Sequence, residues 1–118
     1  MPYDDKTALL VVDVQNDFAD PSGSLSVAGG EEVLEPLDAE IRAAEKGHAL
    51  VVYTQDWHPE HTPHFRQDGG IWPVHCVGGS WGAELHPGLR MVPGEVIHKG
   101  EDGRDGYSAF SVRDPRGG

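Results

Sequence analysis

Cysteine is almost absent from this chain of 118 residues, which contains only Cys76. A disulfide within the chain is therefore excluded, and a single thiol is typical of a reducing compartment. No apolar run approaches the length of a transmembrane helix, and the N-terminal MPYDDKT has neither the basic start nor the apolar stretch of a secretory signal. We therefore expect a cytoplasmic protein that does not enter a membrane.

Basic residues are also scarce, since nine lysines and arginines stand against twenty aspartates and glutamates and give a formal net charge of −11. Such a chain repels phosphate backbones and anionic lipid surfaces, so nucleic acid is not expected as a partner. The length suffices for one hydrophobic core, and no repeat or linker divides the chain. We expect residues 1–118 to form a single domain.

Histidine, in contrast, is concentrated in one stretch from Asp56 to Cys76. This stretch holds four of the seven histidines, which are His58, His61, His64 and His75. Each one alone is typical of a solvated loop residue, but four imidazoles close to a carboxylate predict a metal site. The side chains of Asp56 and His58 leave an extended segment on the same side, and a third donor would complete a set with positions open to water and substrate.

Three apolar segments predict strands of a parallel sheet. They cover residues 7–14, 49–54 and 95–99. The first has no polar alternation and is typical of a strand buried on both faces. Between the first two, apolar residues at helical spacing (Val33, Leu37, Ile41 and Ala44) predict a helix over 31–46, so strand, helix and strand form a right-handed crossover. Residues 15–30 predict a long loop, and residues 77–89 a short helical turn.

Charged residues stand at the C-terminal ends of these strands, namely Asp13, Asp56 and Lys99. If the strands are parallel, these ends meet at one edge of the sheet, where ligands of open α/β proteins bind. Asp13 could instead cap the next turn, and Lys99 could form a simple salt bridge. Three ionisable strand ends beside a predicted metal site favour a catalytic role.

Several motifs resemble the nicotinamidase branch of the isochorismatase-like cysteine hydrolases, over about residues 8–110. They are LLVVDVQNDF at 9–18, YTQDWHP at 53–59, WPVHCVGGSWGAELHP at 72–87 and HKG at 98–100. The resemblance implies an α/β fold, a three-layer α/β/α sandwich around a mainly parallel sheet. It also implies hydrolysis of nicotinamide to nicotinate and ammonia in NAD salvage. Phe18 and Trp72 match the aromatic walls that hold the ring of this small pyridine carboxamide.

The resemblance also implies one divalent metal ion. Asp56, His58 and His75 match the ligands of the family, and His64 matches a fourth ligand found in some members, with His61 as the competing candidate. Zinc is the ion we expect first, and iron or manganese would also accept one carboxylate and two or three imidazoles.

Asp13 and Lys99 match two members of the family's catalytic triad, whose third member is a cysteine. Asp13 would take the proton of the thiol nucleophile, and Lys99 would hold the charge balance of the site. The family's cysteine lies in a later segment, so we expect this chain to lack its C-terminal segment and to need a complementary segment, a second chain or a homo-oligomer. The strand at 7–14 would then be an exposed edge.

Cys76 is not the equivalent of that nucleophile. In an extended segment neighbouring side chains point to opposite faces, so a ligand at His75 turns Cys76 away from the metal. We interpret Cys76 as a buried structural thiol.

Two other hypotheses stay open. One is a family member that acts on another amide or on a vinyl ether such as isochorismate, although the resemblance favours nicotinamide because the isochorismate branch lacks the metal site at Asp56, His58 and His75. The other is an inactive module that binds a metal or a partner and retains the scaffold without the nucleophile. Ammonia release from nicotinamide separates these hypotheses.

Overall fold

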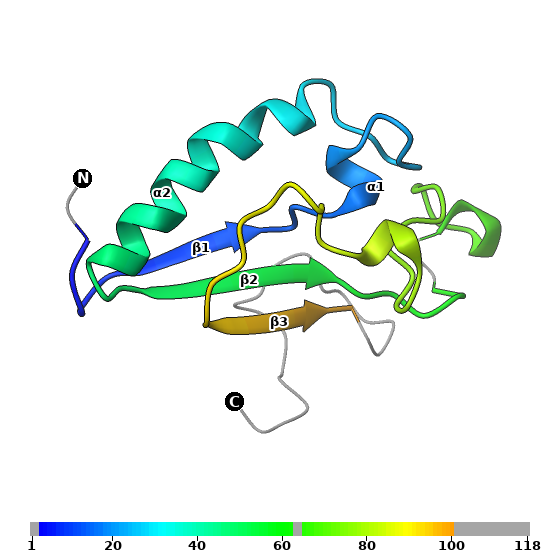
Figure 1. Ribbon diagram of the computed structural model, residues 1–118. Helices are drawn as coiled ribbons and strands as arrows, with labels where there is room; N and C mark the ends of the chain where they lie inside the picture. The colour runs from blue at the N-terminus through cyan, green and yellow to red at the C-terminus, as the bar shows by residue number, and fades with distance from the viewer. Residues whose placement is uncertain (1–2, 63–64, 101–118) are drawn as a thin grey trace.

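The computed structural model of the chain describes residues 3–62 and 65–100. Its three strands form one sheet in the order β1-β2-β3, with both neighbouring pairs parallel, and they span Ala8–Val12, Leu50–Asp56 and Glu95–Lys99. The three predicted strands are confirmed, although β2 continues to Asp56 itself. All three arrows point the same way in Figure 1, so the carboxyl ends of the strands meet at one edge of the sheet.

Helix α2, which spans Leu34–Lys46, connects β1 to β2 and covers one face of the sheet (Figure 1). Its residues Ile41 and Ala44 are completely buried in a core that includes Val11 and Val51. Full burial of a side chain such as Ile41 contributes about 1.5–3 kcal/mol to stability. The predicted apolar face of the helix is therefore what attaches it to the sheet.

The start of this helix differs from the prediction. Residues Gly30–Val33 form a 3-10 turn, η1, before the α-helix begins. A 3-10 turn has three residues per turn instead of 3.6, so Val33 rotates out of the apolar face and is exposed. Only the later members of the predicted apolar set lie in the core.

Strand β1 is not buried on both faces, and that prediction is wrong for the part of the chain that the structure describes. Val11 is buried, but Leu10 is 38% exposed and Val12 is 59% exposed. Side chains alternate along a strand, and α2 covers only the face on which Val11 lies. Among the described residues no strand pairs with the outer side of β1.

The segments that directly follow β1 and β2 lie at the carboxyl edge of the sheet, to the right in Figure 1. Helix α1, Asn16–Ala19, forms directly after β1 within the segment predicted to be a loop. The connection between β2 and β3 contains two 3-10 turns, η2 at Arg66–Asp68 and η3 at Trp81–Ala83, and η3 confirms the predicted helical turn. None of the helices in the described ranges is both long and apolar enough to cross a membrane.

His48 follows α2 in the left-handed conformation, with φ of 61°. For residues other than glycine this conformation costs about 1–2 kcal/mol of stability, and glycine is the usual residue after a helix end. We expect His48→Gly to raise the free energy of unfolding by about 0.5–1 kcal/mol, since part of the gain is offset by the larger freedom of glycine in the unfolded chain. Urea denaturation measures this change. His48→Ala is the control, because it removes the exposed imidazole but keeps the strain, and it should not stabilise the chain.

Candidate active site

Lys99, the last residue of β3, is 2% exposed, and its ammonium group lies between two carboxylates. Nζ donates a hydrogen bond of 2.6 Å to Oδ2 of Asp13 and lies 3.5 Å from Oδ1 of Asp56. A buried ammonium is costly unless it is paired, and these carboxylates provide the pairing. The convergence of the three charged strand ends, predicted from the sequence, is confirmed.

Asp13 has an unusual backbone conformation with φ of 54°, a left-handed value that few residues other than glycine adopt. Oδ1 accepts a 2.6 Å hydrogen bond from the hydroxyl of Thr54, and Oδ2 accepts the bond from Lys99. The carboxylate is thus engaged by β2 and β3. It does not cap α1, whose N-cap is Gln15 and which has no side-chain cap.

Asp56, His58 and His75 form a second buried group next to this pair, and one donor atom of each lies within 4.8 Å of the other two. Nε2 of His58 and Nε2 of His75 are 3.7 Å and 3.9 Å from Oδ2 of Asp56, which is too long for hydrogen bonds. A tetrahedral ion with bonds of about 2.0–2.1 Å holds its ligands about 3.3 Å apart. Small side-chain movements would therefore close this set around one cation.

The orientation of His75 also suits a metal ligand. Its Nδ1 donates a 2.8 Å hydrogen bond to the carbonyl oxygen of Pro73, which directs the lone pair of Nε2 toward Asp56. The ring of Phe65, which is completely buried, lies edge-on to the rings of His58 and His75, with 5.4 Å between ring centroids in each case. The two imidazoles are thus held by an apolar wall on one side.

Burial and charge favour protonation states of Asp56 and His75 that suit a bound cation. Burial alone would raise the pKa of Asp56, but contact with His58 and the charges of Lys99, His58 and His75 outweigh it and hold the pKa below its ordinary value. Burial lowers the pKa of His75 and so favours the neutral imidazole that metals bind. An ionised carboxylate with neutral imidazole fits a divalent cation.

His61 and His64 are the two remaining histidines of this loop. The side chain of His61 is 74% exposed, and its Nδ1 lies 3.2 Å from Oδ1 of Asp68. His61 is not part of the buried group of three. His64 lies outside the described residues, so its role as fourth ligand stays a prediction.

Cys76 is completely buried, and its Sγ lies 3.8 Å from the carbonyl oxygen of Gly82. Burial raises the pKa of this thiol, and the charges of Asp56, Asp17 and Asp13 raise it further, so the reactive thiolate is disfavoured. The interpretation as a buried thiol is confirmed. The argument for it assumed an extended segment in which neighbouring side chains alternate between two faces. That assumption was wrong, because Cys76 has φ of 49° and the segment is not extended here.

Phe18 and Trp72, the predicted aromatic walls, lie in different surroundings. The ring of Phe18 is half-buried, with its centroid 5.7 Å from that of His75, and together with Asp13 it lines a mainly apolar cavity of about 150 Å³. Trp72 is 36% exposed and forms an isolated backbone bridge with Phe65. Phe18 thus lies near His75 and lines the same cavity as Asp13, while the role of Trp72 stays a prediction.

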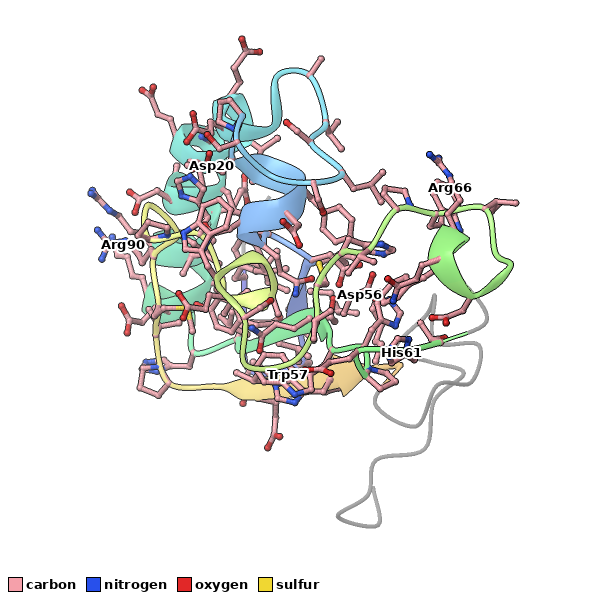
Figure 2. The ribbon with its side chains drawn as sticks, turned by 90° about the vertical axis from the view of Figure 1, so that its right-hand side faces the viewer. Asp20, Asp56, Trp57, His61, Arg66 and Arg90 are labelled. Carbon is pink, nitrogen blue, oxygen red and sulfur yellow. The ribbon has the colours of Figure 1, made fainter. Side chains whose placement is uncertain are left out.

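Two buried side chains that the sequence analysis did not single out hold this edge together. Gln15 and Asp17 follow β1 and form hydrogen bonds to the segments that carry Asp56 and His75. Their signal in the sequence is the polar run Gln-Asn-Asp directly after an apolar strand. Figure 2 looks onto this edge of the molecule and labels Asp56, the last residue of β2.

Comparisons with known proteins agree with this geometry. The isochorismatase domain family matches residues 7–114. The nicotinamidase of Saccharomyces cerevisiae is 37% identical over 115 residues, which cover 77% of this chain and 52% of that protein. The crystal structure of the pyrazinamidase of Pyrococcus horikoshii in complex with zinc is similar with a TM-score of 0.82 and 39% identity, over 89% of this chain and 58% of the other.

A second similar structure is that of PnC1 from L. infantum in complex with nicotinate, with a TM-score of 0.81 and 38% identity. It is matched over the whole of this chain and 59% of its own. The chain spans about half the length of the curated relatives it matches, with 52% and 56% of the first two covered. The predicted α/β sandwich is thus represented here by its parallel three-stranded sheet with helices.

Proposed function

The chain belongs to the isochorismatase domain family, and from this premise we propose that it forms the metal-binding and acid–base part of an amidohydrolase that converts nicotinamide to nicotinate and ammonia. The observation that carries the proposal is the position of Lys99, whose ammonium joins Asp13 to Asp56. The ammonium group of Lys99 thereby links a candidate proton acceptor, Asp13, to a candidate metal ligand, Asp56. Similar proteins named nicotinamidase support the choice of substrate.

In this reaction Asp13 accepts the proton of a thiol, and the resulting thiolate attacks the carbonyl carbon of the amide. Asp13 then returns the proton to the departing nitrogen, so that ammonia leaves and a thioester remains, which water hydrolyses to nicotinate. Lys99 and Thr54 donate to the two oxygens of Asp13 and keep the carboxylate oriented throughout. A positioned acid–base group of this kind contributes about 10²–10⁴-fold to a rate.

Asp56, His58 and His75 would hold the metal ion, for which we propose zinc, with iron and manganese as ions that the same donors accept. When bound, the ion supplies Lewis-acid chemistry toward the ring nitrogen of the substrate and toward water. Phe18, beside His75 and Asp13, would offer its ring face to the pyridine, and Trp72 a second aromatic surface. The zinc in a similar pyrazinamidase structure supports this assignment.

The nucleophile, in our proposal, comes from a further segment or a second chain and not from Cys76, because burial disfavours its thiolate. The outer edge of β1 ends at Val12, beside the apolar cavity, and no strand of the described residues pairs with it, so this edge could accept an added strand. Residues 1–118 would then belong to one domain that is completed by this partner. We propose that the active assembly works in the cytoplasm, in NAD salvage.

The test combines a native mass measurement with an ammonia-release assay on nicotinamide. We expect release from samples in which a cysteine-bearing partner accompanies the chain. Asp13→Asn should lower the rate by at least about 100-fold, since it removes the base. Asp38→Asn, which changes a carboxylate of α2 that pairs with Arg42 and Arg90, is the matched control and should leave the rate unchanged.

Cys76→Ala should also retain the rate. Turnover by the chain without any partner, lost in Cys76→Ala, would contradict the proposed source of the nucleophile. Metal binding without turnover in any assembly would favour the inactive module.

A further inference from the structure

Gln15 holds the backbone of Asp56 from the side where β1 has left the sheet. The last pair in the β1–β2 ladder is Val12 with Thr54, after which the chain turns away at Asp13. The side chain of Gln15, which is completely buried, takes over there, since its Oε1 accepts the N–H of Asp56 and its Nε2 donates to the carbonyl oxygen of Asp56, both at 2.8 Å. One carboxamide thus replaces the peptide group that a longer β1 would have provided.

The same Nε2 also donates a 2.8 Å hydrogen bond to the carbonyl oxygen of Ala83 in η3. Both N–H groups and the oxygen of the Gln15 amide are therefore used, and each partner is a backbone group. Backbone positions at the end of β2 and in η3 are fixed relative to α1 in this way. Because Asp56 is the last residue of β2, fixing its backbone also limits the positions that its carboxylate can take.

Asp17, two residues further on, holds the segment of His75. Its Oδ2 accepts a 2.7 Å hydrogen bond from the N–H of Cys76, and its Oδ1 accepts one of 3.1 Å from the N–H of Ser24. Cys76 has the left-handed φ of 49°, which needs support from its surroundings. A carboxylate that accepts a hydrogen bond from the main chain directly after His75 provides this support.

His58, the third residue of the group with Asp56 and His75, is hydrogen-bonded to the backbone of Cys76. The carbonyl oxygen of Cys76 accepts the N–H of His58 at 2.9 Å, and the carbonyl oxygen of His58 accepts the N–H of Gly78, also at 2.9 Å. His58 and His75 are therefore joined by the backbone of Cys76, which Asp17 holds. Gly82 lies against the carboxylate of Asp17, so closely that a Cβ atom at this position would clash with it, and Gly82 thus bounds the carboxylate on one side.

We propose that Gln15 and Asp17 are positioning residues that set the separation of Asp56, His58 and His75 and thereby the affinity and geometry of the metal site. This inference rests on the metal site of the proposed function but not on any activity. Partners that orient metal ligands in this way contribute about 10–100-fold to metal affinity.

The test is a titration of the metal-free chain with Co²⁺, whose visible absorption reports both affinity and coordination geometry. We expect Asp17→Asn and Gln15→Glu each to weaken Co²⁺ binding by about 10–100-fold and to change the shape of the absorption bands. Asp17→Asn keeps the size of the side chain but removes its charge and one acceptor oxygen. Gln15→Glu removes both N–H donors and faces two carbonyl oxygens with a carboxylate.

Two variants serve as matched controls. Gln67→Glu changes an exposed glutamine of η2, and Asp38→Asn changes an α2 carboxylate that pairs with Arg42 and Arg90. Both should bind Co²⁺ as the unchanged chain does. Thermal unfolding of each metal-free variant shows whether it folds, and Gln15→Met replaces Gln15→Glu if the latter shows no cooperative transition.

If Gln15 and Asp17 had only a structural role, the variants would unfold at a lower temperature but would bind Co²⁺ with unchanged affinity and spectrum. That result would overturn this inference and leave the proposed metal site standing. Absence of Co²⁺ binding by the unchanged chain would overturn both the inference and the metal site. Weaker binding with altered bands in the two variants, and not in the controls, supports the inference whether or not the assembly hydrolyses nicotinamide.

Discussion

Replacing Lys99 with methionine is expected to lower the free energy of unfolding by about 3–5 kcal/mol, the usual loss when one partner of a buried ion pair is removed. Methionine fills a similar volume, so the loss comes from charge. The carboxylates of Asp13 and Asp56 are mostly buried and would be left facing each other without the ammonium between them. Urea denaturation followed by circular dichroism measures the change.

The matched control is Lys6→Met, since Lys6 is exposed in a turn near the N-terminus, and it should stay within about 0.5 kcal/mol of the unchanged chain. Asp13→Asn combined with Lys99→Met should recover part of the loss, because one of the two unpaired charges is then removed as well. A single Lys99→Met variant as stable as the control would show that the ammonium is not needed to keep the carboxylates together.

Removing His75 is expected to weaken zinc binding by more than about 100-fold, beyond the 10–100-fold that an orienting partner alone contributes. His75 is one of three buried donors within 4.8 Å of one another, and its Nδ1 is already used by Pro73. In His75→Ala the ion would keep only Asp56 and His58 among these donors. Competition with a chromophoric chelator measures the affinity.

His61→Ala is the matched control, because His61 belongs to the same loop but is exposed and lies on Asp68. It should leave the zinc affinity within about twofold, whereas His64→Ala should lower it about tenfold or more if His64 is the fourth ligand. A loss in His61→Ala as large as in His75→Ala would mean that the loop rearranges around the metal. If all three variants bound zinc as tightly as the unchanged chain, the metal site would not lie in this loop.

The sequence was most informative where a pattern repeats or accumulates. Three apolar runs predicted the strands, and the charged residues at their ends predicted that Asp13, Asp56 and Lys99 meet, because a parallel sheet brings such ends together. The density of histidine indicated the loop that carries the candidate metal donors. This density could not separate His61 from the buried candidate donors His58 and His75, since exposure depends on how the loop folds and not on its composition.

Other features could not be predicted because they depend on contacts between distant segments. Burial of β1 on both faces was expected from its apolar residues alone, but a strand is buried only where something covers it, and α2 covers one face. The side-chain amide of Gln15 acts as part of a β-ladder only because the chain turns at Asp13. The left-handed Cys76 depends likewise on a carboxylate 59 positions away.

The left-handed backbone at Asp13 restricts which amino acids could serve at this position. Glycine adopts φ of 54° without strain but has no proton acceptor, and asparagine tolerates it but has no carboxylate. Glutamate has the carboxylate, but its longer side chain lacks the local hydrogen bonding that makes this conformation accessible to aspartate and asparagine. The shape of the main chain and the proposed role as a carboxylate base therefore select the same residue, and aspartate is the acidic amino acid that satisfies both.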